Sequence, residues 1–239
     1  MKPGERIILA LDVSGHDEAI DIVQKFREEV DIFKVGSELF TSVGPGIVEE
    51  INSIGKKVFL DLKFHDIPNT VCKSALAAAK LGVFMFNVHT LGGFEMMKQA
   101  AQALTKFCLE KNIERPRLIG VTILTSIDQT ALRDELGIDI RMSTHVKYLA
   151  GLAQRAGLDG VVASPEDAEI IRPRFGKDFL IVTPGIRPPW AAADDQKRVL
   201  TPKDALRRGA DYLVIGRAVF SQPDPVRALK RIKEEIAGA

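Results

Sequence analysis

Two charged residues at the end of an apolar segment are the first feature of the chain that suggests chemistry. Asp61 and Lys63 follow the apolar residues 58–60 and are separated by a single leucine. On a β-strand alternate side chains point to the same face, so this carboxylate and this ammonium are expected to lie side by side. A second acid, Asp66, follows three residues later. An ammonium held between two acids can stabilise a developing negative charge and then donate a proton.

Lys34 adds a fourth charge, because it stands near the end of the preceding apolar segment, 31–36. Neighbouring parallel strands lie about 4.8 Å apart, so Lys34 is expected to approach Asp61. The predicted order is Lys34, Asp61, Lys63, Asp66, in which each charge stabilises its neighbours. A structural ion-pair network is the alternative interpretation of any one Asp–Lys pair. Four charges at apolar strand ends favour catalysis, since exposed pairs stabilise little and buried pairs are costly.

The elements that must position these charges repeat eight times along the chain. Short apolar segments predict strands at residues 6–12, 31–36, 57–63, 83–88, 117–124, 158–163, 179–183 and 212–215. Amphipathic stretches between and after them predict helices at 17–28, 93–111, 145–156, 202–208 and 225–236. The pattern predicts an α/β fold, a single (β/α)8 TIM-type barrel over residues 1–239, with its active site at the carboxyl ends of the strands.

An open doubly wound sheet is the alternative fold for such a pattern. Residues 11–15 after the first strand lack the glycine-rich motif that binds dinucleotides, which weakens this alternative. No linker divides the chain. Two long stretches, 126–144 and 185–201, are expected to be irregular, and loops of this length usually cover a site or move.

Composition narrows the possible partners. The 33 Lys and Arg residues nearly balance the 32 Asp and Glu residues, so the net charge of +1 supplies no broad field for nucleic acid or anionic lipid. Cys72 and Cys108 lie too far apart in sequence for a typical zinc or redox motif. We see no signal-peptide pattern and no apolar run that could span a bilayer, so the cytoplasm is the expected location.

Six segments of the sequence, in order, resemble orotidine 5′-phosphate decarboxylases. The most specific is Asp61-Leu62-Lys63-Phe64-His65-Asp66-Ile67-Pro68-Asn69-Thr70. The others are residues 9–12, 34–36, 121–126, 183–188 and 214–217. The similarity extends over essentially the whole chain, and it implies the decarboxylation of orotidine 5′-monophosphate to uridine 5′-monophosphate in pyrimidine biosynthesis.

This reaction has a high barrier unless the protein stabilises its product anion. Loss of carbon dioxide from C6 leaves a negative charge in the plane of the ring, which the π system cannot delocalise. No motif for a cofactor that could accept the electrons is present, and neither metal nor cofactor is expected. The resemblance implies that Lys63 stabilises the C6 carbanion and protonates it. Asp61 would hold Lys63 near the leaving carboxylate.

The remaining ligand contacts are expected at other strand ends. Barrels commonly bind phosphate in the loops after strands seven and eight. There Gly216 allows close approach and Arg217 can grip phosphate, although a solvated surface arginine is the alternative. The resemblance adds Arg187 and Gln196 to this end, and Gln196 would also reach the pyrimidine. Asp12 and Lys34 would bind the ribose, and Thr125 would read the edge of the pyrimidine.

The resemblance also implies a homodimer with two active sites at its interface. In such a dimer Asp66, Ile67 and Thr70 serve the site of the neighbouring subunit. Sequence spacing by itself does not show this arrangement. His65 and His89 are left out of the predicted site, because lone histidines near strand ends more often pack than catalyse.

Two other functions remain open at the level of the sequence. The first is a magnesium-dependent sugar-phosphate decarboxylase or synthase of the same barrel superfamily, which carries a similar Asp-x-Lys-x-x-Asp run. Such enzymes hold magnesium with an acid on the second strand, where this chain has Lys34, whose charge would repel the ion. The second is a nucleotide-binding barrel without catalysis, which the four intact charges argue against.

Overall fold

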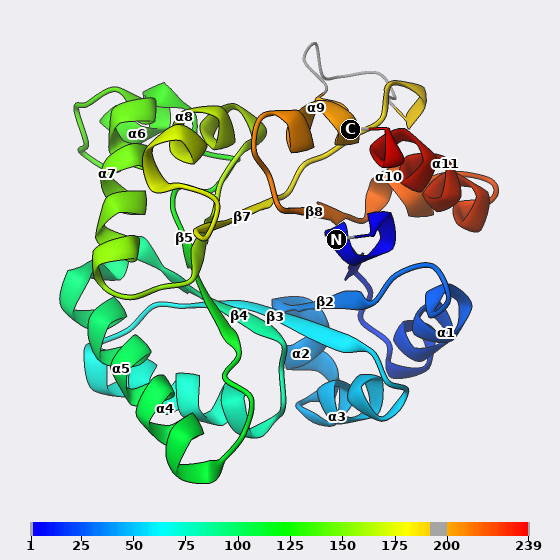
Figure 1. Cartoon of the computed structure of the whole chain (residues 1–239), viewed down its shortest axis with the longest axis horizontal. Helices are drawn as coiled ribbons and strands as arrows, with labels where there is room; N and C mark the ends of the chain where they lie inside the picture. Colours follow the sequence, from blue (N-terminus) through cyan, green and yellow to red (C-terminus); the bar gives the residue numbers. More distant parts are fainter. Residues whose placement is uncertain (1, 192–199, 239) are drawn as a thin grey trace.

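Eight parallel strands close into a barrel in the computed structural model, which describes residues 2–191 and 200–238. Each strand pairs with the next along the chain, and β8 pairs with β1 to complete the circle (Figure 1). All eight predicted strands are present, so the barrel is confirmed and the open sheet is excluded. The strands are β1 Ile7–Leu11, β2 Ile32–Gly36, β3 Lys57–Phe64, β4 Met85–His89, β5 Arg117–Val121, β6 Gly160–Val162, β7 Leu180–Thr183 and β8 Tyr212–Ile215.

Helices surround the strands as an outer ring (Figure 1). The five predicted helices are present with ends within three residues of those expected. The α-helices are α1 His16–Phe26, α2 Ser37–Val43, α3 Gly46–Ser53, α4 Pro68–Lys80, α5 Gly93–Lys111, α6 Gln129–Asp134, α7 Met142–Arg155, α8 Pro165–Phe175, α9 Pro202–Arg207, α10 Arg217–Phe220 and α11 Pro225–Ala237. Three short 3-10 turns are η1 Pro3–Arg6, η2 Thr90–Gly92 and η3 Pro189–Ala191.

The stretch 126–144, which we expected to be irregular, contains helix α6 and the first residues of α7. Asp128 caps α6 by accepting a hydrogen bond from a backbone N–H of its first turn. The side chain of Gln129 then accepts from the N–H of Met142 at 2.7 Å and donates to the carbonyl of Ile140 at 3.0 Å. The expectation was wrong here because polar side chains hold these short turns, and hydrophobic periodicity does not reveal such contacts.

Alternation along the strands places an apolar layer inside the barrel and a polar layer above it. Seven strands contribute one residue each to the apolar interior, namely Ile8, Ile32, Phe59, Met85, Ile119, Val182 and Tyr212. The next side chain on the same face of a strand belongs to the residue two positions further on. On β2, β3 and β4 these residues are Lys34, Asp61 and Asn87. The charged layer therefore lies directly above the apolar layer, toward the carboxyl ends of the strands.

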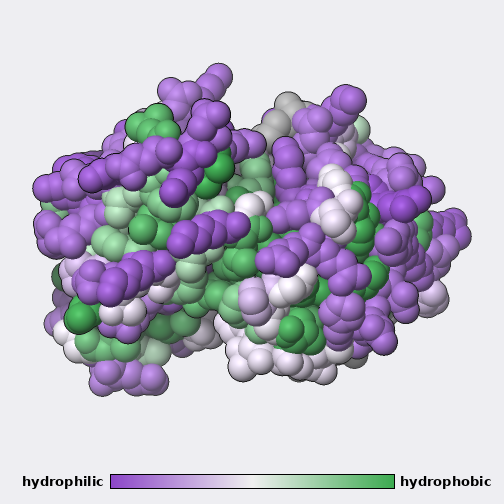
Figure 2. All heavy atoms as spheres, turned by 90° about the horizontal axis from the view of Figure 1, so that it is seen from below, coloured by the Kyte–Doolittle hydropathy of each residue, from purple (hydrophilic) through white to green (hydrophobic). Residues whose placement is uncertain are grey.

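The outer surface is mixed in polarity. Figure 2 shows one face on which hydrophilic side chains cover most of the surface and hydrophobic atoms reach the surface between them. Among residues 2–191 and 200–238, no helix combines the length and the apolar character that crossing a membrane requires.

Candidate active site

Lys34, Asp61 and Lys63 form a continuous ion-pair cluster at the carboxyl ends of β2 and β3. The Nζ atom of Lys63 donates a hydrogen bond to Oδ1 of Asp61 at 2.8 Å, and Nζ of Lys34 lies 3.7 Å from Oδ2 of Asp61. The side chains of Lys34 and Asp61 are only 11% and 15% exposed, whereas that of Lys63 is 34% exposed. Lys63 is therefore the member of the cluster most open to a ligand.

The first strand joins the cluster through Asp12. Nζ of Lys34 donates to Oδ1 of Asp12 at 3.0 Å, so Lys34 is shared by two carboxylates. Asp12 directly follows β1 and its side chain is 55% exposed. The predicted proximity of Lys34 to Asp61 is present. The same contact geometry leaves part of the Asp12 carboxylate free to accept hydrogen bonds from a ligand.

Strand β3 is irregular at Lys63, the residue that contacts Asp61. The pairing of β3 with β4 shifts register between Leu60 and Phe64, and Lys63 has a φ of 52°, in the left-handed region. Residues other than glycine, asparagine and aspartate rarely adopt this conformation, and such strain is concentrated at functional sites. The shift breaks simple alternation, yet Asp61 and Lys63 still meet. The predicted Asp–Lys contact is present, but the backbone at Lys63 is not the regular strand that simple alternation assumes.

Opposing effects set the charge of Asp61. Burial by itself raises the pKa of Asp61, but the nearby charges of Lys34 and Lys63 and the hydrogen bonds from Lys63 and Asn87 lower it. The lowering effects together are larger, so the pKa of Asp61 lies below the ordinary aspartate value. A carboxylate that stays ionised in a largely buried position holds the two lysines on either side of it.

Asp66, Ile67 and Thr70 do not join this cluster within one chain. All three are exposed, and Ile67 is 66% exposed although it is apolar. Oδ1 of Asp66 accepts a hydrogen bond from the backbone N–H of Ile67 at 2.6 Å, and Asp66 forms no ion pair with another described residue. The fourth charge of the predicted array thus stands apart from the other three at the start of α4.

The residues predicted to bind phosphate lie after β7 and β8. Gly216 directly follows β8. It lies so close to the first strand that a Cβ atom on it would be 3.0 Å from Oδ2 of Asp12. Arg217 begins α10 and is exposed, and Arg187 is partly buried. Among the described residues, neither arginine side chain forms an ion pair with an acid. Both guanidinium groups are therefore unneutralised by described acids.

Of the two other predicted contact residues, Thr125 and Gln196, the structure describes only Thr125. Thr125 is exposed four residues after the end of β5, on the same rim of the barrel. Gln196 lies outside the described residues, so its predicted contact stays a prediction.

Asn87 is a buried site residue that the sequence reasoning missed. It lies on β4 with 1% exposure, and its side chain contacts both Asp61 and Lys63. Its segment was interpreted only as an apolar strand. An amide between Phe86 and Val88 was nevertheless a usable signal, because a buried polar side chain needs partners.

The two histidines near the cluster pack against each other. The ring centroids of His65 and His89 are 5.4 Å apart. Burial, His65 and Lys63 all lower the pKa of His89, so its neutral form is favoured. The exclusion of both histidines from the site stays a prediction.

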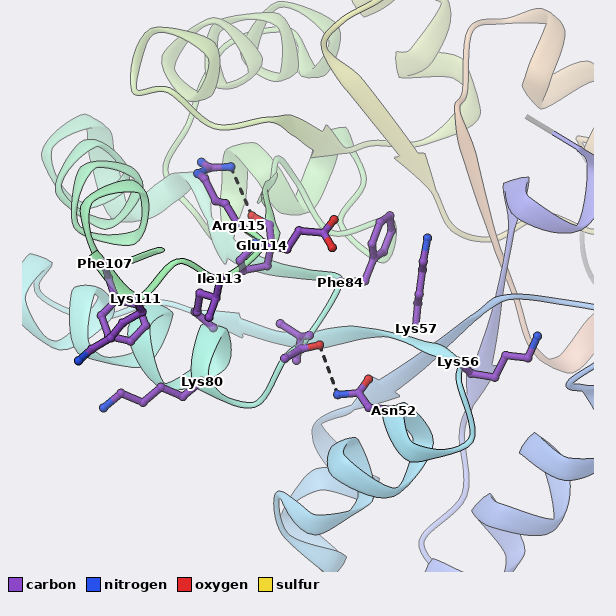
Figure 3. A pocket seen from close by; sticks show the side chains of 14 residues that line it. Asn52, Lys56, Lys57, Lys80, Phe84, Phe107, Lys111, Ile113, Glu114 and Arg115 are labelled. Atoms are coloured by element: carbon purple, nitrogen blue, oxygen red, sulfur yellow. Dashed lines mark hydrogen bonds between the residues drawn. The ribbon is translucent and has the colours of Figure 1, made fainter. Parts of the chain in front are cut away.

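A basic cavity of about 680 Å³ lies elsewhere, at the amino-terminal ends of β3, β4 and β5 (Figure 3). Lys57, Lys80 and Lys111 stand around it, with Phe84 and Phe107 in its wall. None of the predicted site residues lines it. In β/α barrels this end serves stability, whereas active sites lie at the carboxyl ends of the strands. The Lys34–Asp61–Lys63 cluster is therefore the better candidate site.

Comparison with known proteins identifies the family. A model described as "Orotidine 5'-phosphate decarboxylase / HUMPS family" matches residues 5–232. The chain belongs to this family. Curated proteins named orotidine 5′-phosphate decarboxylase are similar to it, including one from Pelobacter propionicus with 52% identity, covering 97% of this chain and 95% of that protein. One from Syntrophotalea carbinolica is 50% identical, covering 98% of this chain and 96% of that protein.

Solved structures agree with this family assignment. Orotidine 5′-phosphate decarboxylase from Lactobacillus acidophilus is similar with a TM-score of 0.85 and 38% identity, over 97% of this chain and 99% of that one. The corresponding structure from Pyrococcus horikoshii OT3 has a TM-score of 0.75 and 28% identity, over 98% of this chain and 100% of that one. For this member of the orotidine 5′-phosphate decarboxylase / HUMPS family, sequence comparison and structure comparison thus support the same family and the same barrel fold.

The charge of Asp61 in this family member can be tested directly. We expect the carboxyl group of Asp61, followed through the ¹³C NMR signal of its carboxyl carbon, to titrate with a midpoint below pH 3.8 or to remain ionised until the protein unfolds. Because the native pKa is lowered, ionised Asp61 adds to stability above about pH 3.8, and this contribution is lost as the pH falls through the native pKa. Lys34→Met should raise the midpoint, whereas Lys57→Met at the other end of β3 should not. A wild-type midpoint above 3.8 contradicts the assignment.

Proposed function

We propose that the protein decarboxylates orotidine 5′-monophosphate to uridine 5′-monophosphate, without metal or cofactor, as a step of pyrimidine biosynthesis. One observation carries the proposal: a partly open Lys63 ammonium lies 2.8 Å from the carboxylate of Asp61, which is 15% exposed, at the carboxyl end of the barrel. Family membership and relatives about 50% identical that bear the name of this enzyme support it.

The chemistry needs a fixed cation beside C6 of the pyrimidine. The bond between C6 and the carboxylate carbon breaks, carbon dioxide leaves, and the electron pair remains on C6. The ammonium of Lys63 stabilises this in-plane charge and then transfers a proton to C6, which completes uridine 5′-monophosphate. The resulting amine recovers its proton from water. A preorganised charge is effective here because the apolar layer below the cluster excludes water from one side.

Asp61 and Lys34 prepare Lys63 for this role. Asp61 accepts a hydrogen bond from Lys63 and therefore restricts the direction of its ammonium. The carboxylate of Asp61 would also lie near the leaving carboxylate of the ligand and repel it before the bond breaks. Lys34 neutralises Asp61 from the opposite side and bridges to Asp12. We therefore propose Lys63, Asp61 and Lys34 as catalytic residues, and Asp66 as a fourth that reaches the site of the partner subunit.

The other strand ends supply ligand contacts in this proposal. Asp12 and Lys34 bind the ribose hydroxyls, and Thr125 contacts the pyrimidine. Arg217 and Arg187, with the backbone at Gly216 and the side chain of Gln196, bind the phosphate. Two guanidinium groups without described acid partners suit a dianionic phosphate, which arginine can contact with two parallel hydrogen bonds. Binding energy from the phosphate then helps to position the distant C6.

The charge of Lys34 separates this proposal from a magnesium-dependent reaction. The family's name carries HUMPS beside the decarboxylases, so the family alone leaves the reaction open. Nζ of Lys34 lies between Asp12 and Asp61, 3.0 Å and 3.7 Å from their nearest oxygens. An ammonium in this position neutralises the acids that a divalent cation would need and repels the cation itself. The residues present therefore favour the metal-independent reaction.

We further propose that the protein is a homodimer in which Asp66, Ile67 and Thr70 reach the site of the partner. Ile67, Leu91 and Phe94 are exposed apolar residues of the segments that follow β3 and β4, and these segments meet where a Cβ atom on Gly92 would lie 3.2 Å from the ring of His65. Exposed apolar side chains that gather in one region favour a protein interface. An exposed Asp66 without an ion partner among residues 2–191 and 200–238 suits such a role.

Three further assignments accompany this proposal. We take residues 1–239 as one domain, because a single barrel is closed by the pairing of its first and last strands. We place the protein in the cytoplasm, where nucleotide biosynthesis takes place. We expect no binding to nucleic acid or membrane, because the net charge is only +1.

Loss of the orotate ultraviolet absorbance in buffer with EDTA tests the reaction itself. The wild-type protein should consume orotidine 5′-monophosphate at the same rate with and without the chelator. Lys63→Ala should reduce kcat by about a thousandfold or more, because it removes both the cation and the proton donor. Lys57→Ala, on the same strand but at the opposite end, is the control. Calorimetry should still detect uridine 5′-monophosphate binding to Lys63→Ala. Dependence on added magnesium, or full activity of Lys63→Ala, would falsify the proposal.

The phosphate contacts are tested by Arg217→Ala. Removing a guanidinium that binds a part of the ligand away from the reacting carbon should raise KM about 10- to 100-fold. Arg207→Ala removes another exposed arginine, at the end of α9, and should leave the kinetics unchanged. Equal KM values for wild type and Arg217→Ala would remove Arg217 from the phosphate site.

Mixed dimers test whether Asp66 acts across the interface. Asp66→Ala and Lys63→Ala should each be inactive alone, but their co-expression should restore about a quarter of wild-type activity, since half of the dimers then hold one complete site. The control pair is Asp61→Ala with Lys63→Ala. These two residues belong to the same site, so no mixed dimer can be complete and activity should stay absent. An inactive Asp66→Ala and Lys63→Ala mixture, with mixed dimers shown to be present, argues that Asp66 serves its own chain.

A further inference from the structure

Asn87 connects the two central residues of the cluster from a third strand. Its Nδ2 donates a hydrogen bond to Oδ1 of Asp61 at 2.6 Å, and its Oδ1 accepts one from the backbone N–H of Lys63 at 2.7 Å. The same Asp61 oxygen accepts the hydrogen bond from Nζ of Lys63 at 2.8 Å. Asp61, Lys63 and Asn87 thus form a closed ring of three hydrogen bonds. We propose that Asn87 is a positioning residue that keeps Asp61 ionised and fixes the backbone from which the Lys63 ammonium extends.

The orientation of the amide follows from its two partners. A backbone N–H can only donate, so the group that faces Lys63 must be the carbonyl oxygen of Asn87. An ionised carboxylate can only accept, so the group that faces Asp61 must be the NH₂. A flipped amide would place donor against donor and acceptor against acceptor. The contacts favour charged Asp61, because a carboxylate oxygen accepts the hydrogen bond from the NH₂ more strongly than the carbonyl oxygen of a neutral acid would.

The backbone of Lys63 needs this partner because β3 departs from regular pairing at that point. The register between β3 and β4 shifts between Leu60 and Phe64, and Lys63 adopts a φ of 52°. A backbone N–H at such a bulge loses its partner in the ladder, and leaving it unpaired within the protein is costly. The side chain of Asn87 takes the place of the missing carbonyl. One amide thereby supports the strained conformation and the charge that depends on it.

Asn87 is fully buried in the barrel, so it acts only through its neighbours. Its exposure is 1%, which leaves no surface for a ligand. The charged groups around Asp61 come from several strands: Lys34 on β2, Lys63 on β3 and, through Lys34, Asp12 after β1. On β4, His89 lies near Lys63. Burial, His65 and Lys63 lower the pKa of His89, so His89 itself is mainly neutral. Loss of Asn87 should therefore change the rate of the chemical step more than the binding of the ligand.

The inference builds on the proposed function, and two substitutions test it. Asn87→Ala removes both hydrogen bonds and should lower kcat about 10- to 100-fold, while KM changes less than about threefold. Asn87→Asp keeps the shape but sets a second carboxylate against Asp61. Two carboxylates at this distance tend to share a proton, so the acidic limb of the kcat profile should move upward by about one pH unit or more.

Thr90→Val is the matched control for these substitutions. Thr90 is as buried as Asn87 and lies three residues further along, but its hydroxyl donates to the carbonyl of Val121 at 2.8 Å and contacts none of the cluster. Its loss should lower thermal stability and leave kcat and the pH profile as in wild type. If Asn87→Ala and Asn87→Asp also change only stability or the folded fraction, with wild-type kcat per folded molecule and an unmoved pH profile, Asn87 has no positioning role.

A measurement without turnover separates this inference from the proposed function. In the ¹³C titration of Asp61, Asn87→Ala should raise the midpoint, because a hydrogen bond that favours the ionised form is lost. This result does not require the protein to be a decarboxylase. An inactive wild type would overturn the proposed function alone. An unchanged Asp61 midpoint in Asn87→Ala would overturn the inference, whatever the activity of the wild type.

Discussion

The whole site depends on one buried carboxylate. Desolvation opposes the charge of Asp61, which is only 15% exposed, and the ion can persist only if nearby groups outweigh that cost. Lys34, Lys63 and Asn87 do so, and they come from the strands on both sides of Asp61 as well as from its own. In return, Asp61 holds two ammonium groups near each other that would otherwise repel. Burying charges is costly even when they are paired, so the position of this cluster in the barrel is better explained by chemistry than by stability.

The barrel makes this charge distribution possible by stacking a polar layer on an apolar one. Phe59 and Met85 belong to the apolar interior, and the residues two positions beyond them are Asp61 and Asn87. The charges therefore have packed hydrocarbon below and the mouth of the barrel above. Their interactions are stronger than they would be in water, and they require no rearrangement when a ligand arrives. Closure of the sheet between β1 and β8 also brings Asp12 beside Gly216, which links the predicted ribose and phosphate ends.

Strain at the end of β3 and exposure in the turn after it have a common functional interpretation. Lys63 adopts a left-handed conformation, and four residues later Ile67 leaves two thirds of its apolar surface in solvent. Neither feature favours the stability of a single chain. Both become understandable if this turn supplies one active site with Lys63 and a second one, in a partner subunit, with Asp66. The catalytic and assembly roles of the segment would then be inseparable.

Local patterns were sufficient to predict the eight strands, five of the helices and the Asp61–Lys63 pair, because alternation and helical periodicity involve residues only a few positions apart. The contact of Lys34 with Asp61 also followed, since consecutive parallel strands are neighbours. Asn87 did not follow, because its role depends on a register shift between β3 and β4 that apolar patterning does not encode. Likewise, Gly216 lies so close to Asp12 that a Cβ atom on it would be 3.0 Å from the Asp12 carboxylate, which brings together residues from near the two ends of the chain. Only the closed barrel sets such distances, because strand register and closure determine which distant residues meet.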